Sequence, residues 1–253
     1  MKDVEYERMA SIEARMWWYR NLHHNLLAVA ARCVGAPLDA ALAGKKVLDA
    51  GCGAGGVLMR FEQAAPAGLY YGIDISERAV ELARQKSRAD IVLGSVDDLP
   101  YPNDEFDVIL SADVLLHERV EEGRAIDELR RCLKADGVLI VNMPAYKWLR
   151  SYHDENVGGA RRYSRAEVRR LFAGHRMRTR IATYWNTVFF PAMVAKRKVL
   201  PNKGDKSDVE LMAEPLEALF FGLTALERAL IRAGASLPYG GSVMWAGERD
   251  EAA

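Results

Sequence analysis

The 253-residue sequence has no excess of charge of either sign, because 35 Lys and Arg residues balance 35 Asp and Glu residues. This balance argues against a bulk electrostatic attraction to nucleic acid. No apolar run approaches the ~20 residues that span a membrane, and residues 1–8 are too charged for a signal peptide. We therefore expect a cytoplasmic globular protein that does not bind nucleic acid.

Cysteine is also scarce. Cys33, Cys52 and Cys132 are far apart and form no Cys-x-x-Cys pair, which predicts neither a disulfide framework nor a zinc site. No group of histidines and carboxylates has the spacing of metal ligands, so we expect no metal. Half of the residues are hydrophobic, which is enough for the core of one medium-sized domain.

The order of apolar segments predicts an α/β fold, a doubly wound Rossmann-like sheet. Residues 1–43 contain two helical patterns, which we interpret as an N-terminal helical lid. Residues 44–185 and 241–249 supply the strands and helices of the core. Residues 186–240 predict a helical insertion before the last strand. All of 1–253 is then a single domain.

A glycine-rich turn follows the first predicted strand. Residues 47–50 (VLDA) lead into Gly51, Gly53 and Gly55, which allow a tight turn and let a ligand lie against bare main chain. Asp74 follows the next strand, twenty-three residues after Gly51. A carboxylate there can accept hydrogen bonds from two ribose hydroxyls. The pattern predicts a pocket for an adenosine-containing cofactor.

Asp49 narrows the choice of cofactor. A carboxylate just before the glycine turn would repel phosphate, but it suits a ligand with an ammonium group, such as an amino acid. The phosphate-binding pattern that ends in Gly-Lys-Ser/Thr is absent. A nicotinamide dehydrogenase therefore fits poorly.

Two further motifs, residues 94–101 (GSVDDLPY) and 106–117 (FDVILSADVLLH), complete an ordered series. Residues 46–143 resemble a class I S-adenosylmethionine-dependent methyltransferase of the ubiquinone/menaquinone-methyltransferase-like group. The resemblance implies a seven-stranded, mostly parallel sheet and S-adenosylmethionine as cofactor. It places the glycine turn at the methionine part, Asp74 at the ribose, Asp97 and Asp98 at the adenine, and Ser111 and Ala112 below the sulfonium. The expected cofactor-binding set is Asp49, Ala50, Gly51, Gly53, Gly55, Asp74, Ile75, Val96, Asp97, Asp98, Ser111 and Ala112.

Three adjacent aromatic residues, Trp17, Trp18 and Tyr19, cannot all point to one side of a helix. At least one must reach a pocket or another element. We interpret Trp18 and Tyr19 as a lid that covers the cofactor and excludes water from the sulfonium. Packing of the N-terminal helices onto the sheet is the alternative.

The loop 151–164 carries the residues expected to bind the acceptor. His153 could remove a proton, because its ordinary pKa lies near working pH, and Asp154 lies beside it. Arg161 and Arg162, followed by Tyr163, could hold a phosphate or carboxylate. The alternative is structural: Asp154 pairs with an arginine and fixes the loop.

His117, after the fourth strand, is a competing base. Trp185 precedes an aromatic stretch at residues 187–191. We interpret the insertion as an acceptor lid with a hydrophobic pocket, for which Trp185 is a candidate wall. An extra core or a dimer interface is the alternative. Residues 196–198 (KRK) beside this stretch would also suit a peripheral contact with anionic lipid.

These features favour methyl transfer from S-adenosylmethionine to a small-molecule oxygen, nitrogen or carbon acceptor, which is hydrophobic or lipid-linked if the insertion forms its pocket. Alignment and desolvation would be the main work of the protein. Two alternatives remain open: cyclisation or other non-methylating chemistry in the same pocket, and a non-catalytic adenosine-binding module. The chain would act as a monomer or a homodimer.

Overall fold

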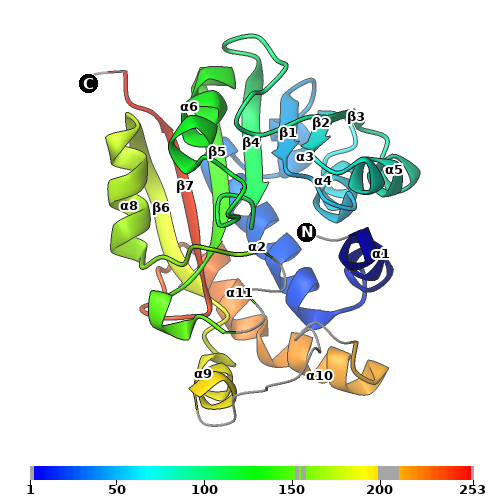
Figure 1. Cartoon of the computed structure of the whole chain (residues 1–253), viewed down its shortest axis with the longest axis vertical. Helices are drawn as coiled ribbons and strands as arrows, with labels where there is room; N and C mark the ends of the chain where they lie inside the picture. Colours follow the sequence, from blue (N-terminus) through cyan, green and yellow to red (C-terminus); the bar gives the residue numbers. More distant parts are fainter. Residues whose placement is uncertain (1–2, 152–153, 155–157, 199–210, 252–253) are drawn as a thin grey trace.

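A computed structural model describes residues 3–151, 154, 158–198 and 211–251 (Figure 1). It contains a seven-stranded sheet in the order β3-β2-β1-β4-β5-β7-β6. All neighbours are parallel except β7, which runs antiparallel to β5 and β6. The strands are β1 (Lys46–Ala50), β2 (Leu69–Asp74), β3 (Asp90–Leu93), β4 (Phe106–Ala112), β5 (Leu133–Pro144), β6 (Met177–Trp185) and β7 (Ser242–Arg249). The predicted doubly wound fold is confirmed.

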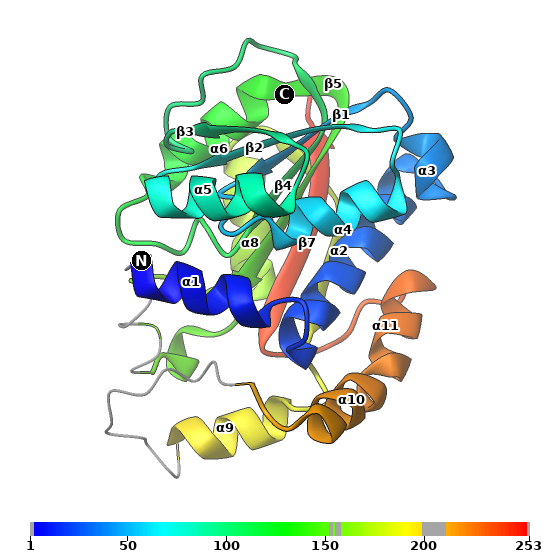
Figure 2. The same cartoon turned by 90° about the vertical axis from the view of Figure 1, so that its right-hand side faces the viewer.

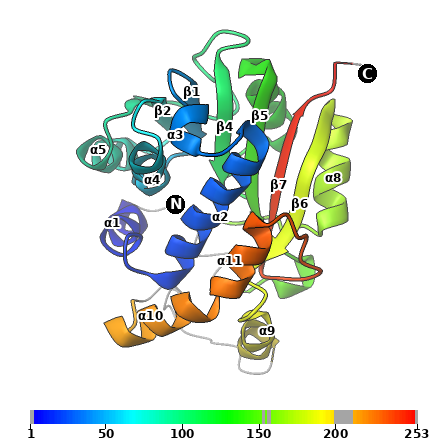
Figure 3. The ribbon, with the colours of Figure 1, turned by 180° about the vertical axis from the view of Figure 1, so that it is seen from behind.

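Helices cover both faces of the sheet because alternate strand residues are apolar on each side. One core contains Leu26, Leu58 and Ile231, which come from the helices seen in Figure 3. The other contains Ile126 and Phe172. The helices of the first face are α2 (Trp17–Val34), α3 (Leu38–Ala41), α4 (Gly56–Ala64), α5 (Glu77–Lys86) and α11 (Ala225–Arg232), and those of the second are α6 (Glu122–Cys132) and α8 (Arg165–Gly174).

Local capping sets where two of these helices begin. The Ser76 hydroxyl accepts from the Ala79 N–H (3.3 Å), as its place before α5 predicts. Ser164 and Glu167 form the reciprocal bonds of a capping box at the start of α8. These side-chain bonds satisfy main-chain N–H groups that have no partner within the helix.

The remaining helices gather beyond the carboxyl ends of the parallel strands (Figure 2). They are α1 (Asp3–Ile12), α9 (Phe190–Lys198), α10 (Glu214–Leu223) and the short 3-10 helix η1 (Lys147–Leu149). The strand order reverses between β1 and β4, and ligands of open α/β sheets bind at such a point. No helix within the described ranges is long and apolar enough to cross a bilayer.

Candidate functional site

The glycine turn follows β1, at the point where the strand order reverses. The surroundings of two of its glycines require glycine. Gly51 has φ 85°, and a Cβ there would lie 2.3 Å from Cγ2 of Val114. Gly55 has φ 84°, and its Cβ would meet the Ala83 backbone at 3.0 Å. Both the positive φ and the lack of space exclude larger residues. The turn therefore presents bare main chain between β1 and α4.

Asp74, at the end of β2, organises this turn. Its Oδ2 accepts from the Gly53 N–H (2.9 Å), and its Oδ1 accepts from the Ser76 N–H (3.0 Å) and the Tyr6 hydroxyl (3.3 Å). The carboxylate is buried but lies on the cavity wall. A ribose that binds Asp74 would therefore compete with Tyr6 on α1.

Asp49 lies at the other side of the turn and has unused bonding capacity. It is 1% exposed, and its Oδ2 has no hydrogen-bond partner within the described part of the chain. Burial, with smaller contributions from the charges of Asp74 and Glu13, raises the pKa of Asp49 to about 8. An uncompensated buried carboxyl group fits the ammonium group of S-adenosylmethionine.

Cofactor binding at pH 7 is therefore expected to release close to one proton. The free carboxyl group of Asp49 is mostly protonated below a pKa of about 8, and a bound ammonium would lower that pKa. Affinity should rise between pH 6 and 8. Calorimetric titration in buffers of different ionisation enthalpy measures the proton count. The Asp49→Asn variant should release none, and equal release by both proteins would contradict the assignment.

The first helix covers the turn. Met9 Cε would lie 2.7 Å from a Cβ at Gly53, and Oε2 of Glu13 would lie 2.2 Å from one at Gly56. Lys86 of α5 forms an ion pair with Glu13 and also donates to the Ala10 carbonyl (3.2 Å). These bonds hold α1 beside α5, over the part of the cavity that is expected to hold the methionine part of the cofactor.

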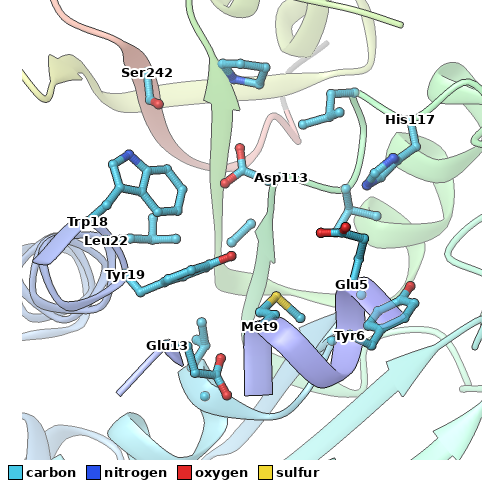
Figure 4. A pocket seen from close by; sticks show the side chains of 18 of the residues that line it. Glu5, Tyr6, Met9, Glu13, Trp18, Tyr19, Leu22, Asp113, His117 and Ser242 are labelled. Carbon is cyan, nitrogen blue, oxygen red and sulfur yellow. The ribbon is translucent and has the colours of Figure 1, made fainter. Parts of the chain in front are cut away.

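The aromatic triplet at the start of α2 points in different directions, as its spacing predicts. Trp17 packs on Phe189 at 4.7 Å between ring centroids, while Trp18 contacts Tyr19 at 5.1 Å and Trp185 at 5.4 Å. All three members of the triplet line the same cavity. Figure 4 shows Trp18 and Tyr19 side by side on this wall.

The cavity extends from the glycine turn to the insertion and has a volume of about 1440 Å³. This is more than the 300–1,000 Å³ that is usual for one small ligand. Its far end contains the apolar residues Phe189, Met193, Met212 and Phe220, together with Lys196 and Arg197 of α9. The cavity can therefore hold an acceptor beside the cofactor.

Several expected cofactor residues line this cavity, and others do not. Ser111 donates to the Ala50 carbonyl (3.1 Å), and Asp97 accepts from the Glu121 N–H (3.1 Å). The Asp98 side chain is 83% exposed beside Arg124. The expected cofactor residues on the wall are Trp18, Tyr19, Asp49, Gly51, Gly53, Asp74, Ile75, Val96 and Ala112; those off it are Ala50, Gly55, Asp97, Asp98 and Ser111.

The arginine loop is built largely from internal bonds. Arg162 forms an ion pair with Asp154 (2.7 Å) and donates to the Ala145 carbonyl (2.9 Å). Arg161 donates to the carbonyls of Leu115 (3.2 Å) and His117 (2.7 Å). Of these side chains, Asp154, Arg162 and His117 still reach the cavity wall. His153 lies outside the described residues.

Tyr163 and Trp185 were expected to contact the acceptor, but each forms a hydrogen bond with another side chain of the protein. The Tyr163 hydroxyl donates to Glu122, and its side chain is buried in the core beneath α6 and α8. Trp185 is fully buried, and its Nε1–H donates to Oδ1 of Asn142 (2.7 Å). Neither residue is part of the cavity wall.

Breaking the Arg162–Asp154 pair should destabilise the fold. Both side chains are only 7% exposed, and removing one partner of a buried pair costs about 3–5 kcal/mol. Denaturant unfolding of Arg162→Met measures this loss. Lys147→Met is the control, because its pair with Glu167 involves a lysine side chain that is 74% exposed and should contribute at most about 1 kcal/mol. Equal losses would contradict the interpretation.

The stability from this pair should also depend on pH. Burial alone would raise the pKa of Asp154, but the hydrogen bond and charge of Arg162 lower it overall. A depressed pKa contributes stability above the unfolded value of 3.8, which is lost as pH falls through the folded pKa. The difference between wild type and Arg162→Met should therefore shrink in acid.

The sequence did not identify Asp113, the residue that follows β4. It has φ 58°, and its N–H donates to the Asn142 carbonyl (3.0 Å). Asn142 Nδ2–H donates back to Asp113 Oδ2 (2.9 Å). The Asp113 carboxylate points into the cavity between Tyr19 and His117 (Figure 4). Burial raises the pKa of Asp113 to about 7, although the Asn142 bond and the Arg162 charge oppose this rise.

Residues 48–141 match the family described as "Methyltransferase domain". The match spans 94 of the 253 residues. The cofactor of the domain is S-adenosylmethionine, as the sequence predicts, and Asp49 and Asp74 suit its ammonium and ribose groups. Within the described ranges, no group of three or more His, Cys, Asp or Glu side chains is placed to hold a metal ion.

Two relatives match part of the chain. Magnesium-protoporphyrin O-methyltransferase of Synechocystis is 37% identical over 93 residues, or 35% of this chain and 40% of that protein. Phthiotriol/phenolphthiotriol dimycocerosates methyltransferase of Mycobacterium tuberculosis is 29% identical over 99 residues, which are 38% of this chain and 36% of that protein. The matched region thus spans less than half the length of either relative.

The fold continues beyond that region. A chain in the complex between the Haloferax volcanii Trm112 methyltransferase activator and the putative methyltransferase superposes with a TM-score of 0.65. The alignment covers 99% of this chain and 96% of that one, at 20% identity. The likeness therefore extends to the N-terminal helices and the insertion, and it concerns the fold alone.

Proposed function

We propose that the protein transfers the methyl group of S-adenosylmethionine to a hydrophobic small molecule with an O–H or N–H nucleophile, and that Asp113 accepts the proton. The observation that carries this proposal is the position of Asp113, a carboxylate that faces the same cavity as Phe189, Met193 and Phe220. The two named relatives act on different acceptors, so the cavity wall is the better guide. The motif resemblance alone supports placement in the ubiquinone/menaquinone-methyltransferase-like group.

The residues of the first half of the cavity would hold the cofactor. Asp74 would bind the ribose, Asp49 the ammonium, and the glycine turn the main chain of the methionine part. S-adenosylmethionine supplies an activated methyl group on a sulfonium. Trp18 and Tyr19, together with α1, would exclude water from that end of the cavity.

The other half would align the acceptor. Phe189, Met193 and Phe220 favour an apolar body. As the oxygen–carbon or nitrogen–carbon bond forms and the sulfur–carbon bond breaks, the acceptor proton passes to Asp113. Asn142 holds one carboxylate oxygen at 2.9 Å, which leaves the other for the acceptor. Trp185 bonds to Asn142 from behind, so its role is to position Asp113 through Asn142.

The test is the release of S-adenosylhomocysteine in the presence of organic, aqueous and macromolecular fractions of a cell extract. The organic fraction should support turnover above the rate without acceptor. Turnover only with the aqueous fraction would contradict a hydrophobic acceptor. Tight cofactor binding without turnover in any fraction would favour non-methylating chemistry, and absence of cofactor binding would contradict the whole proposal.

A further inference from the structure

Helices α10 and α11 have their apolar side toward solvent. Five leucines repeat at intervals of three and four residues and are between 39% and 69% exposed. Every exposed position from 215 to 230 is Pro, Leu, Ala or Gly. Helix pairs normally direct such a stripe inward, and an exposed patch of this kind marks an interaction site. This leucine face consists of Leu216, Leu219, Leu223, Leu226 and Leu230.

Two of the three acidic groups of these helices are directed inward, and Glu214 at the start of α10 is exposed. Buried Glu217 accepts from the N–H groups of Trp17 (2.6 Å) and Met212 (2.9 Å). Buried Glu227 accepts from those of Asn186 and Thr187, both at 2.6 Å. These four bonds fix the rotation of both helices, so the leucine face is a consequence of how the insertion is anchored.

A group of arginines lies along one flank of this face. The Arg20 and Arg228 guanidinium groups stack on Phe221 of α10, at 3.8 and 3.7 Å from the ring centroid. Burial and then the charges of Arg228, Arg60, Arg20 and Arg232 lower the pKa of the nearby His24. Among the described residues, none of these four arginines lies within ion-pair distance of a carboxylate. The arginine strip consists of Arg20, Arg228 and Arg232.

We infer that the leucine face and the arginine strip together dock the protein on an anionic lipid bilayer. Leucines that enter the boundary between headgroups and acyl chains, flanked by guanidinium groups that pair with lipid phosphates, form the arrangement of an interfacial helix. The positive charge of the arginine strip complements the negative charge of lipid phosphates, which favours an anionic bilayer as the partner. Arg228 and Arg232 belong to α11, which packs along α2 (Figure 3).

A second copy of the chain fits this surface less well. The two helices have 10 and 8 residues, so at 1.5 Å per residue they present a strip about 27 Å long and about 10 Å wide. That is roughly 300 Å², compared with about 800 Å² per partner in a standard interface. An antiparallel two-fold pairing on the leucines would also bring two arginine strips to the same side, where they repel.

Helix α10, which carries part of the leucine face, also contributes to the cavity wall. Phe220 of α10 lines the apolar end, together with Phe189 and Met193 from the α9 region. A docked protein would therefore present the apolar end of its cavity close to the lipid. The docking itself does not depend on methyl transfer.

Vesicle flotation of the full chain, without cofactor or acceptor, tests the inference. Vesicles of phosphatidylcholine with phosphatidylglycerol should carry the protein up the gradient, and pure phosphatidylcholine should carry less. The double variant Leu219→Gln/Leu226→Gln should bind at least about tenfold more weakly. The matched control is Leu69→Gln, because Leu69 is 46% exposed at the amino end of β2.

The arginine strip has its own pair of variants. Arg232→Gln should weaken binding to anionic vesicles about fivefold, whereas Arg169→Gln, exposed on α8, should have little effect. Added salt should reduce binding of the wild type. Failure of the wild type to float with anionic vesicles, or equal binding by the leucine double variant, would overturn the inference. A dimer in light scattering that the double variant dissociates, without flotation, would assign the face to a second copy instead.

Discussion

Asp113→Asn is expected to lower the rate of methyl transfer by about 10²- to 10⁴-fold, the usual contribution of a positioned base. The amide keeps the shape of the side chain and can still accept from Asn142, which now donates to Oδ2 at 2.9 Å. It cannot take a proton from the acceptor. Affinity for S-adenosylmethionine should therefore stay within about threefold of wild type, since the proposed cofactor contacts lie on other residues.

The pH profile separates this role from a structural one. Burial raises the pKa of Asp113 to about 7, and a base works only when deprotonated. kcat/KM should therefore rise with pH up to about 7 and then level off. The Asp113→Asn variant should lose this rise.

His117→Gln is the matched comparison, because His117 lines the same cavity (Figure 4). Its effect should be small if Asp113 is the base. A large loss in His117→Gln with near-normal activity in Asp113→Asn would assign the base to the histidine and contradict our proposal.

Asp74→Ala is expected to weaken cofactor binding by about 10²- to 10⁴-fold. Two ribose hydroxyls on a carboxylate contribute about 1.5–3 kcal/mol each, and every 1.4 kcal/mol is a factor of ten. The loss should be somewhat larger than the ribose contacts alone predict, because Asp74 also orders the Gly53 and Ser76 N–H groups. Calorimetric titration with S-adenosylhomocysteine measures the affinity.

Asp98→Ala is the control for this experiment. Its side chain is 83% exposed, and exposed substitutions usually change energies by less than about 0.5 kcal/mol. Thermal unfolding of both variants checks that the fold is intact. If Asp98→Ala weakened binding as much as Asp74→Ala, the cofactor would lie further toward the β3 side than our assignment places it.

The strands and helices of the core could be predicted because their signals are local. Alternation between short apolar runs and helical patterns predicts a parallel sheet, and Ser76 and Ser164 mark helix starts by their own side-chain bonds. The glycine turn and Asp74 could be predicted because their spacing follows from one strand–helix–strand unit.

Asp113 could not be found in the same way. Its proposed role depends on Asn142 of β5 and Trp185 of β6, which are distant in the sequence and become neighbours only in the assembled sheet. For the same reason, Trp185 was expected on the acceptor wall, although its indole lies behind Asn142. Arg162 was expected to hold an acceptor group, and the structure gives it Asp154 as a buried partner, which is the structural alternative for this loop.

The leucine face illustrates a second limit. The sequence of α10 and α11 is amphipathic, and a helical pattern alone does not say which side faces the protein. Here the side is set by Glu217 and Glu227, whose carboxylates accept main-chain N–H groups of Trp17, Asn186 and Thr187. Those partners lie 200 and about 40 residues away in the chain.

The most direct test of the central claim uses S-adenosylmethionine with a deuterated methyl group. The protein is incubated with a lipid extract, and the products are identified by mass spectrometry. We predict a lipid-fraction product in which one O–H or N–H hydrogen is replaced by the deuterated methyl group, and we expect Asp113→Asn to form little of it. A rearranged product without the label, or no labelled lipid-fraction product from a protein that binds the cofactor, would contradict the account.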